Sequence, residues 1–113
     1  MKFRGLGVDV IETKRFSPFR HVRQNHFLER NFSKKELAYC FSFKDAVPHL
    51  AGTFAAKESV AKALEQRVLL SSIEIRRKKN GEPTVWIKNR HQKLILVSIS
   101  HTAKTAIAVS IRQ

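Results

Sequence analysis

Hydrophobic positions repeat at different intervals in the two halves of this chain, which predicts helices followed by sheet. All eight phenylalanines lie between Phe3 and Phe54, whereas seven of the eight isoleucines lie at Ile73 or later. Across His49–Arg67, apolar residues recur at steps of three and four, and alanine is frequent. This spacing predicts a long helix with an apolar face and an opposite polar face.

Shorter patterns predict three elements before this helix. Leu6–Ile11 is short and rich in β-branched residues, which predicts a first strand. Glu12–His21 contains Pro18, which is tolerated only in a first turn or at a kink, so we expect a short or broken helix there. Residues 33–36 (SKKE) have the spacing of a capping box, which predicts a helix over Lys34–Ser42.

Alternation with period two predicts the sheet in the second half of the chain. Ser72–Arg76 and Thr84–Lys88 alternate on either side of a turn at residues 80–83, which is typical of a β-hairpin. Leu94–Ser100 and Thr105–Ile111 form a second expected strand pair. The predicted class is α+β: one early strand, three helical segments and four late strands, with the long helix packed on a largely antiparallel sheet.

Size and charge narrow the function. The chain has 113 residues, with 22 Lys and Arg against 9 Asp and Glu, so its formal net charge is +13. At this length about two-thirds of the unfolded surface can be buried, which predicts a single domain over residues 1–113. Because 42% of the residues are hydrophobic, the composition is that of a folded protein with a positive surface. Such a surface attracts nucleic acid, acidic lipid, a polyphosphate ligand or an acidic protein.

A cytoplasmic protein without a membrane partner is expected. The single cysteine, Cys40, cannot form an intramolecular disulfide. The first residues lack the apolar run of a signal peptide, and no apolar stretch approaches the length of a membrane helix.

Two carboxylates and a lysine form the main candidate site. Glu58 and Lys62 are four residues apart on the predicted long helix and therefore share a face. Asp9 lies in an apolar strand, where a carboxylate is costly to bury unless it is paired or binds a cation. If Asp9 and Glu58 meet, they suit Mg²⁺ and substrate phosphates, with Lys62 available to neutralise a leaving phosphate. The alternatives are a surface ion pair between Glu58 and Lys62 and a helix-capping role for Asp9.

Two further segments are candidate anion sites. Residues 98–102 (SISHT) carry hydroxyls and the imidazole of His101 into a tight turn, which suits an anion. A turn whose hydroxyls bond their own backbone explains this pattern equally well. The basic run at residues 76–79 (RRKK) is usually a solvated strand edge, with anion binding as the alternative.

Together, three blocks of the sequence resemble the holo-acyl-carrier-protein synthases, the small single-domain 4′-phosphopantetheinyl transferases. The blocks are GVDVIE at 7–12, AGTFAAKESVAKAL at 51–64 and SISHT at 98–102, and NGEP at 80–83 is similar to the family's N-G-K-P turn. The resemblance implies the 4′-phosphopantetheinyl transferase fold and a role in fatty acid biosynthesis. The implied reaction is Mg²⁺-dependent transfer of the phosphopantetheine arm from coenzyme A to a carrier protein's serine, releasing adenosine 3′,5′-bisphosphate.

The resemblance also implies roles for individual residues. Asp9, Glu58 and Lys62 are the implied catalytic residues. Asp9 and Glu58 would bind Mg²⁺, Glu58 would also act as a base or orient water, and Lys62 would stabilise the departing phosphate. The implied coenzyme contacts are Lys57, Lys62, Gly81, Pro83, His101 and Thr102.

The first helical stretch mixes cations with aromatic side chains, and the resemblance implies that it docks an acidic acyl carrier protein. The residues concerned are Arg15, Phe16, Arg20, Arg23 and Phe27. Core phenylalanines beside solvated arginines explain the same spacing. The family's small members are homotrimers with active sites between subunits, which the resemblance implies here as well.

Two positions depart from the family pattern, and two other functions stay open. Thr53 stands where the family often has arginine and Glu82 where it usually has lysine, so both remove positive charge where phosphates are expected. One alternative is a basic nucleic-acid-binding module, although no helix-turn-helix, RNA-recognition or zinc signature supports it and no nucleic acid partner is expected. The other is a family member that binds nucleotide or carrier without catalysing transfer.

Overall fold

The computed structural model describes residues 2–113 of the chain, which form six strands, three α-helices and two 3-10 helices (η). In chain order these are β1 (Gly5–Glu12), η1 (Thr13–Phe19), α1 (His26–Asn31), α2 (Lys34–Cys40), α3 (Val47–Ala63), η2 (Leu70–Ser72), β2 (Ile73–Arg77), β3 (Pro83–Ile87), β4 (Arg90–His91), β5 (Ile95–His101) and β6 (Thr105–Arg112).

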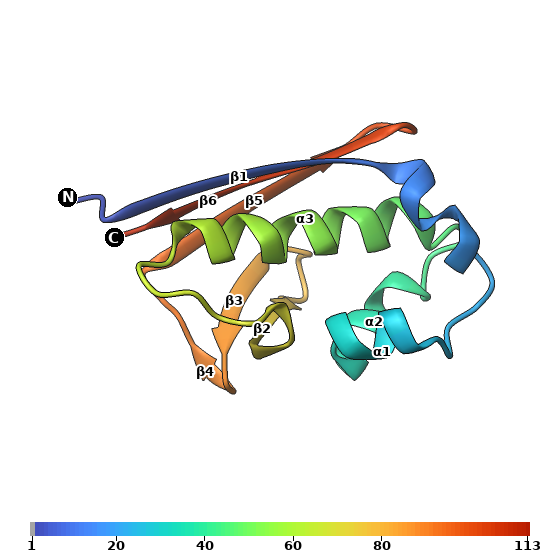
Figure 1. Cartoon of the computed structure of the whole chain (residues 1–113), viewed down its shortest axis with the longest axis horizontal. Coiled ribbons are helices and arrows are strands. Elements are labelled where there is room, and N and C mark those ends of the chain that lie inside the picture. Colours follow the sequence, from blue (N-terminus) through green and yellow to red (C-terminus); the bar gives the residue numbers. More distant parts are fainter. Residues whose placement is uncertain (1) are drawn as a thin grey trace.

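The long helix α3 lies between two layers of other elements (Figure 1). On one side is an antiparallel sheet with the strand order β1-β6-β5. On the other side are a second antiparallel sheet, β2-β3-β4, and the short helices α1 and α2. No helix within residues 2–113 combines the length and the apolarity that a membrane span requires.

The register of β1 decides where Asp9 points. Asp9 pairs with Ala108 of β6, and side chains along a strand alternate between the two faces of the sheet. Asp9 and Ile11 are on the face covered by α3, whereas Val8 and Val10 are exposed on the opposite face. The apolar neighbours of Asp9 in the sequence therefore do not surround its carboxylate.

α3 is buried on almost every side, so the prediction of a broad polar face is wrong. Its polar residues Thr53 and Lys57 are buried under α2, which belongs to the second layer. Ser59 is buried against the first sheet, where its hydroxyl bonds that of Ser110 at 2.6 Å. In the C-terminal half of the helix, a strip containing Glu58 and Lys62 is left accessible.

Two hydrophobic clusters hold the layers together. Around the N-terminal half of α3, the ring of Phe16 lies 5.5 Å from that of Phe54 and 6.2 Å from that of Phe32, measured between centroids. Around the C-terminal half, Ile73, Ile75 and Val85 of the second sheet pack against α3. Offset and edge-on ring pairs of this kind add to the stabilisation from burial.

Most predicted elements are present, with three corrections. The capping box at residues 33–36 is confirmed, since the Ser33 hydroxyl accepts from the Glu36 amide and the Glu36 carboxylate accepts from the Ser33 amide. The long helix ends at Ala63 and not at Arg67. The late strands form two sheets and not one, because no ladder joins β2-β3-β4 to β1-β6-β5, although β3 packs against β5. The short elements α1 and β4 were not predicted from the hydrophobic pattern.

Two glycines allow β1 to approach α3 closely. A Cβ atom on Gly7 would lie 1.9 Å from the carbonyl oxygen of Ser59, and one on Gly5 would lie 1.9 Å from the carbonyl oxygen of Ala63. Such distances leave no room for a side chain. The contact brings Asp9, two residues after Gly7, against the half of α3 that carries the accessible strip.

We expect Gly7→Ala to lower the free energy of unfolding by about 3 kcal/mol, because strand and helix must move apart. Gly52→Ala is the matched control, since its new Cβ would meet only the Cγ2 methyl of Ile99, at 3.1 Å, which a small shift relieves, and alanine favours a helix interior. Denaturant unfolding of both variants tests this, and equal stabilities would contradict it.

Candidate active site

Asp9 and Lys62 meet at the junction of β1 and α3. The Lys62 ammonium donates to the Val8 carbonyl at 2.9 Å and to the Asp9 carboxylate at 3.2 Å. The Asp9 side chain is 16% exposed, and that of Lys62 is 53% exposed. The carboxylate is therefore neither buried in the core nor used as a helix cap, which excludes the capping alternative.

Glu58 lies one turn before Lys62 on the same face of α3 and is half-buried. No ion pair or hydrogen bond joins its carboxylate to any of residues 2–113, so the predicted surface ion pair with Lys62 is not formed. Lys62 is directed to Asp9 instead, and the Glu58 carboxylate is left free beside this pair.

The carboxylates provide oxygen donors of the type that Mg²⁺ prefers. Within residues 2–113 there is no group of three or more His, Cys, Asp and Glu side chains that could hold a metal. Mg²⁺ is commonly bound through one or two carboxylates with water and substrate phosphates, so Asp9 and Glu58 fit this ion better than a metal that needs a full protein cage.

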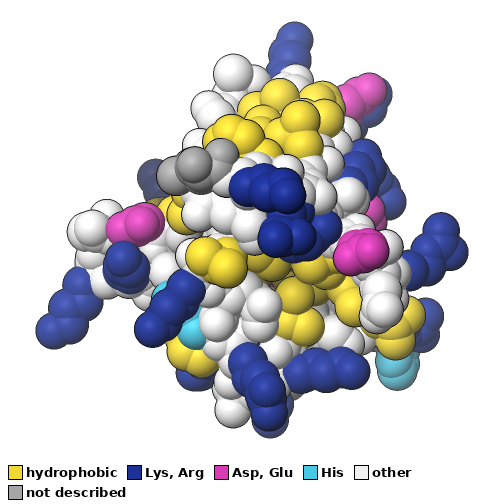
Figure 2. Space-filling view, turned by 90° about the vertical axis from the view of Figure 1, so that its left-hand side faces the viewer, with side chains coloured by type: hydrophobic (Ala, Val, Ile, Leu, Met, Phe, Trp, Pro, Cys, Tyr) yellow, Lys and Arg dark blue, Asp and Glu magenta, His cyan; other side chains and the backbone are white. Residues whose placement is uncertain are grey.

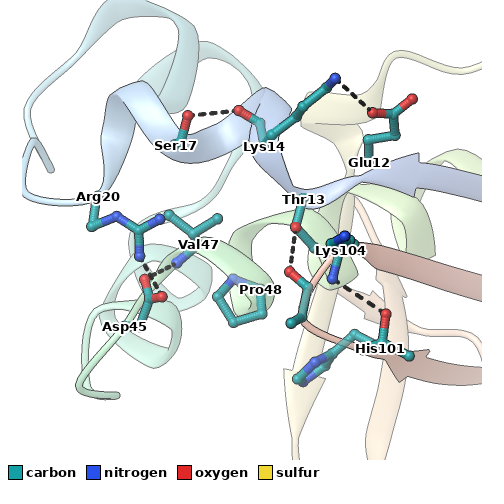
Figure 3. Close-up of a pocket in the computed structure, with 12 residues that line it drawn as sticks. Glu12, Thr13, Lys14, Ser17, Arg20, Asp45, Val47, Pro48, His101 and Lys104 are labelled. Carbon is teal, nitrogen blue, oxygen red and sulfur yellow. Dashed lines mark hydrogen bonds and ion pairs between the residues drawn. The ribbon is translucent and has the colours of Figure 1, made fainter.

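The predicted coenzyme contacts are divided between two clefts of the protomer. Glu58 and Lys62 line a cleft of about 580 Å³ between the C-terminal half of α3 and the segment that follows it. His101 and Thr102 line a separate cleft of about 720 Å³ at the opposite end of β5. Figure 3 shows this second cleft, with His101 and Lys104 on one wall and Arg20 with Asp45 on the other.

The predicted turn contacts, Gly81 and Pro83, lie in the β2-β3 hairpin. Gly81 has a φ of 90°, which only glycine adopts without strain. A Cβ atom at this position would meet no other atom within 4 Å, so the turn faces open space. Glu82, the residue that departs from the family pattern, forms an exposed ion pair with Lys78 at 3.2 Å. Thr53, the other departure, is buried, with its hydroxyl 3.5 Å from the Cys40 sulfur, so it contributes nothing to the surface.

Comparisons with known proteins identify the family. A model described as the 4′-phosphopantetheinyl transferase superfamily matches residues 5–110. The holo-[acyl-carrier-protein] synthase of Thermodesulfovibrio yellowstonii is 38% identical, over 92% of this chain and 93% of the relative. The chain belongs to the holo-acyl-carrier-protein synthase family of phosphopantetheinyl transferases. The family's enzyme from Caldicellulosiruptor bescii is 40% identical, over 96% of each chain.

A solved structure confirms the fold. The holo-(acyl-carrier-protein) synthase of Bacillus anthracis, in complex with CoA (3′,5′-ADP), superimposes with a TM-score of 0.81 at 28% identity. The match covers 97% of this chain and 96% of that one. The resemblance read from residues 7–12, 51–64 and 98–102 is confirmed, together with the α+β class.

Lys57 is not placed to contact a coenzyme in this family member. Its side chain is buried, and its ammonium donates to the Glu36 carboxylate at 2.7 Å and to the Asn31 carbonyl. The same carboxylate accepts from the Ile75 amide at 2.7 Å. Lys57 thus joins α3 to α1, α2 and β2, and the expectation of a coenzyme contact is not supported by its position.

The predicted docking residues divide into core and surface. Phe16 is 1% exposed and belongs to the core, so its predicted contact with a carrier is wrong. Phe27 is half-buried, stacked parallel to Phe19 with 5.6 Å between centroids. The cations are accessible: Arg15 lies 5.3 Å from the centre of the Phe54 ring, Arg20 pairs with Asp45, and Arg23 lines a cleft beside Phe32 and Leu37.

Two residues near the hairpin turn and the second cleft, Tyr39 and His49, were not predicted. Tyr39 supports Arg77, which the sequence predicted only as part of a basic run, and His49 lies against the rings of Phe43 and His101. These contacts join α2, α3, β2 and β5, so they depend on tertiary packing that no local pattern records.

We expect Lys57→Met to lower the free energy of unfolding by about 3–5 kcal/mol, because it leaves Glu36 buried without its ion-pair partner. Burial already raises the pKa of the Glu36 carboxyl, and Lys57 is the strongest influence that lowers it. In the variant, this pKa rises further above its unfolded value. Since such a carboxyl costs stability as the pH rises from its unfolded to its folded pKa, the deficit should be larger at about pH 8 than at about pH 5.

Denaturant unfolding at the two pH values measures this effect. The double variant Lys57→Met with Glu36→Gln should recover part of the loss and remove its pH dependence. Lys34→Met, on the exposed side of α2, is the control for loss of a lysine. A loss of the same size at both pH values would contradict the account.

Proposed function

We propose that residues 1–113 act as one domain that transfers 4′-phosphopantetheine from coenzyme A to a serine of apo-acyl carrier protein, with Mg²⁺ required and adenosine 3′,5′-bisphosphate released. The observation that carries this proposal is the convergence of Asp9 and Lys62 beside the unpaired carboxylate of Glu58. We further propose action in the cytoplasm, supported by a buried free Cys40 whose burial raises the thiol pKa to about 12.

The proposed step needs charge neutralisation at the pyrophosphate of coenzyme A. The carrier's serine oxygen forms a bond to the phosphorus that bears the pantetheine, and the bond from this phosphorus to the bridging oxygen breaks. The leaving bisphosphate takes the electron pair, and the serine proton passes to Glu58 directly or through water. Asp9 and Glu58 would hold Mg²⁺, which supplies positive charge to the pyrophosphate, and Lys62 stabilises the leaving phosphate oxygen.

A self-associating surface is part of the proposal. The outer face of the first sheet, defined here as the apolar sheet face, carries three apolar rows paired across β1 and β6: Leu6 with Ile111, Val8 with Val109, and Val10 with Ile107. Leu6, Val8 and Val10 are 68%, 49% and 60% exposed. In Figure 2, hydrophobic side chains gather at the top of the molecule. The first sheet lies on this same side in Figure 1. Contiguous apolar surface of this kind marks an interface, and a homotrimer of this chain is the occupant we propose.

The division of the coenzyme contacts supports active sites between subunits. One protomer places Glu58 and Lys62 in one cleft and His101 and Thr102 in another. The second cleft is lined by Glu12 and His101, at the ends of β1 and β5, so it adjoins the sheet whose outer face we propose to be the interface. A neighbouring protomer would supply the second cleft to the metal site of the first.

The accessible cations of η1 support carrier docking next to the metal site. Arg15 packs on Phe54, which is one turn of α3 before Glu58. An acidic partner held by Arg15, with Arg20 and Arg23 beyond it, would therefore bring its serine near the proposed Mg²⁺ ligands.

The nucleic-acid alternative lacks a stacking platform. The ring of Trp86 lies between Arg76, 3.9 Å from its centre, and His91, stacked at 4.9 Å between centroids. β2 and β4 flank β3, so the two faces of this ring are covered by protein. A base has no access to either face.

Incubation with coenzyme A, Mg²⁺ and apo-acyl carrier protein should add one phosphopantetheine to the carrier, detected by intact-protein mass. Glu58→Ala should lower kcat/KM by at least about 100-fold, through loss of a metal ligand and base. Glu65→Ala is the matched control: it also lines this cleft but lies beyond the end of α3, and activity should be retained.

A protein that adds no mass to any apo carrier, yet binds coenzyme A, would be a non-catalytic family member and would contradict the proposal. Equal activity of Glu58→Ala and the unaltered protein would remove Glu58 from the site.

A further inference from the structure

Arg77 ends β2 with a guanidinium that is held in place but not neutralised. It lies 4.5 Å from the centre of the Tyr39 ring and donates to the Gly81 carbonyl at 3.2 Å. No acidic side chain within residues 2–113 pairs with it. A half-buried guanidinium with this support keeps donors free and loses little freedom when it binds an anion.

Arg77 stands between the two segments expected to contact the nucleotide. Its bond to Gly81 reaches the hairpin turn directly. From Tyr39, rings continue to His49 at 6.2 Å and then to His101 at 5.4 Å, between centroids. The turn and the His101 cleft are thereby joined along one surface by Arg77 and this row of rings.

The charge around Arg77 is positive. It lines a small cleft of about 290 Å³ between α2 and β2 together with Lys35, Tyr39 and Arg76. Glu74 is the acidic residue nearby, and it is bound to Arg76 at 2.5 Å. Lys35 forms no ion pair within the described chain. The uncommitted cations facing this cleft are therefore Lys35 and Arg77.

The electrostatic reach of Arg77 extends to His49. Burial lowers the pKa of the His49 imidazole first, and the nearby charges of His101 and Arg77 lower it further, against a smaller opposing effect of Asp45. The charge of Arg77 is thus close enough to His49 to affect the pKa of its imidazole. An anion between the two side chains would meet positive potential.

We propose that Arg77 binds the 3′-phosphate of coenzyme A and supplies the cation that Thr53 and Glu82 do not. The inference rests on the proposed function, which places the pyrophosphate at Asp9, Glu58 and Lys62, where the bond is broken. The 3′-phosphate is the remaining phosphate of the coenzyme. Arg77 shares no cleft with the pyrophosphate site and adjoins both nucleotide segments.

Titration calorimetry with coenzyme A and with dephospho-coenzyme A, which lacks the 3′-phosphate, tests this assignment in the presence of Mg²⁺ and without carrier. The unaltered protein should bind coenzyme A at least about 10-fold more tightly than the dephospho form. Arg77→Gln should bring the two Kd values to within about 2-fold of each other by weakening coenzyme A alone. Arg77→Lys keeps the charge but not the planar fork, so its discrimination should be intermediate.

Arg90→Gln removes the same charge from the exposed strand β4 and should discriminate as the unaltered protein does. An unchanged ratio in Arg77→Gln, or equal weakening of both ligands, would overturn the assignment and leave the proposed function intact. If Arg77→Gln does not fold, the ratio of the Kd values for dephospho-coenzyme A and coenzyme A is measured in Arg77→Lys instead. A ratio equal to that of the unaltered protein then overturns the assignment. An unaltered protein that binds neither ligand would overturn the proposed function and this inference together.

Discussion

The buried ion pair between Lys57 and Glu36 is the contact on which the arrangement of the other elements depends. The Glu36 carboxylate caps α2 through Ser33, accepts from Ile75 of β2 and binds Lys57 of α3, while Lys57 also binds the last carbonyl of α1. Two charges buried this completely are costly unless every partner is present. The pair therefore fixes how the second layer meets α3. Because Lys57 faces this layer, Glu58 is turned by about 100° about the helix axis, to the face that carries Lys62.

On the opposite side of α3, the close approach of the β1 backbone to the helix backbone fixes the position of the strand. Gly7 allows β1 to approach so closely that the Lys62 ammonium reaches both the Val8 carbonyl and the Asp9 carboxylate. A helix covered on both sides retains only a narrow accessible strip, and the proposed catalytic groups occupy it. Neighbouring residues of one helix thus serve stability and the proposed chemistry: Lys57 points into the protein, and Glu58 lies on the accessible strip.

The sequence predicted what local patterns and family motifs record. Period-two alternation located β2, β3, β5 and β6, and the spacing of Ser33 and Glu36 located α2. The same patterns failed where tertiary packing decides. Lys57 reads as a surface cation but is buried, Phe16 reads as a docking aromatic but is core, and Arg77 reads as part of a solvated run but lies on Tyr39. The separation of the late strands into two sheets also depends on tertiary packing that no strand pattern contains.

The central claim is that one active site is built from two protomers, with Glu58 from one and His101 from the other. Mixed oligomers of Glu58→Ala and His101→Ala test it most directly, because each variant alone should be inactive. In a closed ring with random mixing, about a quarter of the sites would receive both intact residues, so about a quarter of the unaltered activity should return. No recovery in oligomers shown to be mixed would mean that each protomer uses its own Glu58 and His101, which would contradict the account.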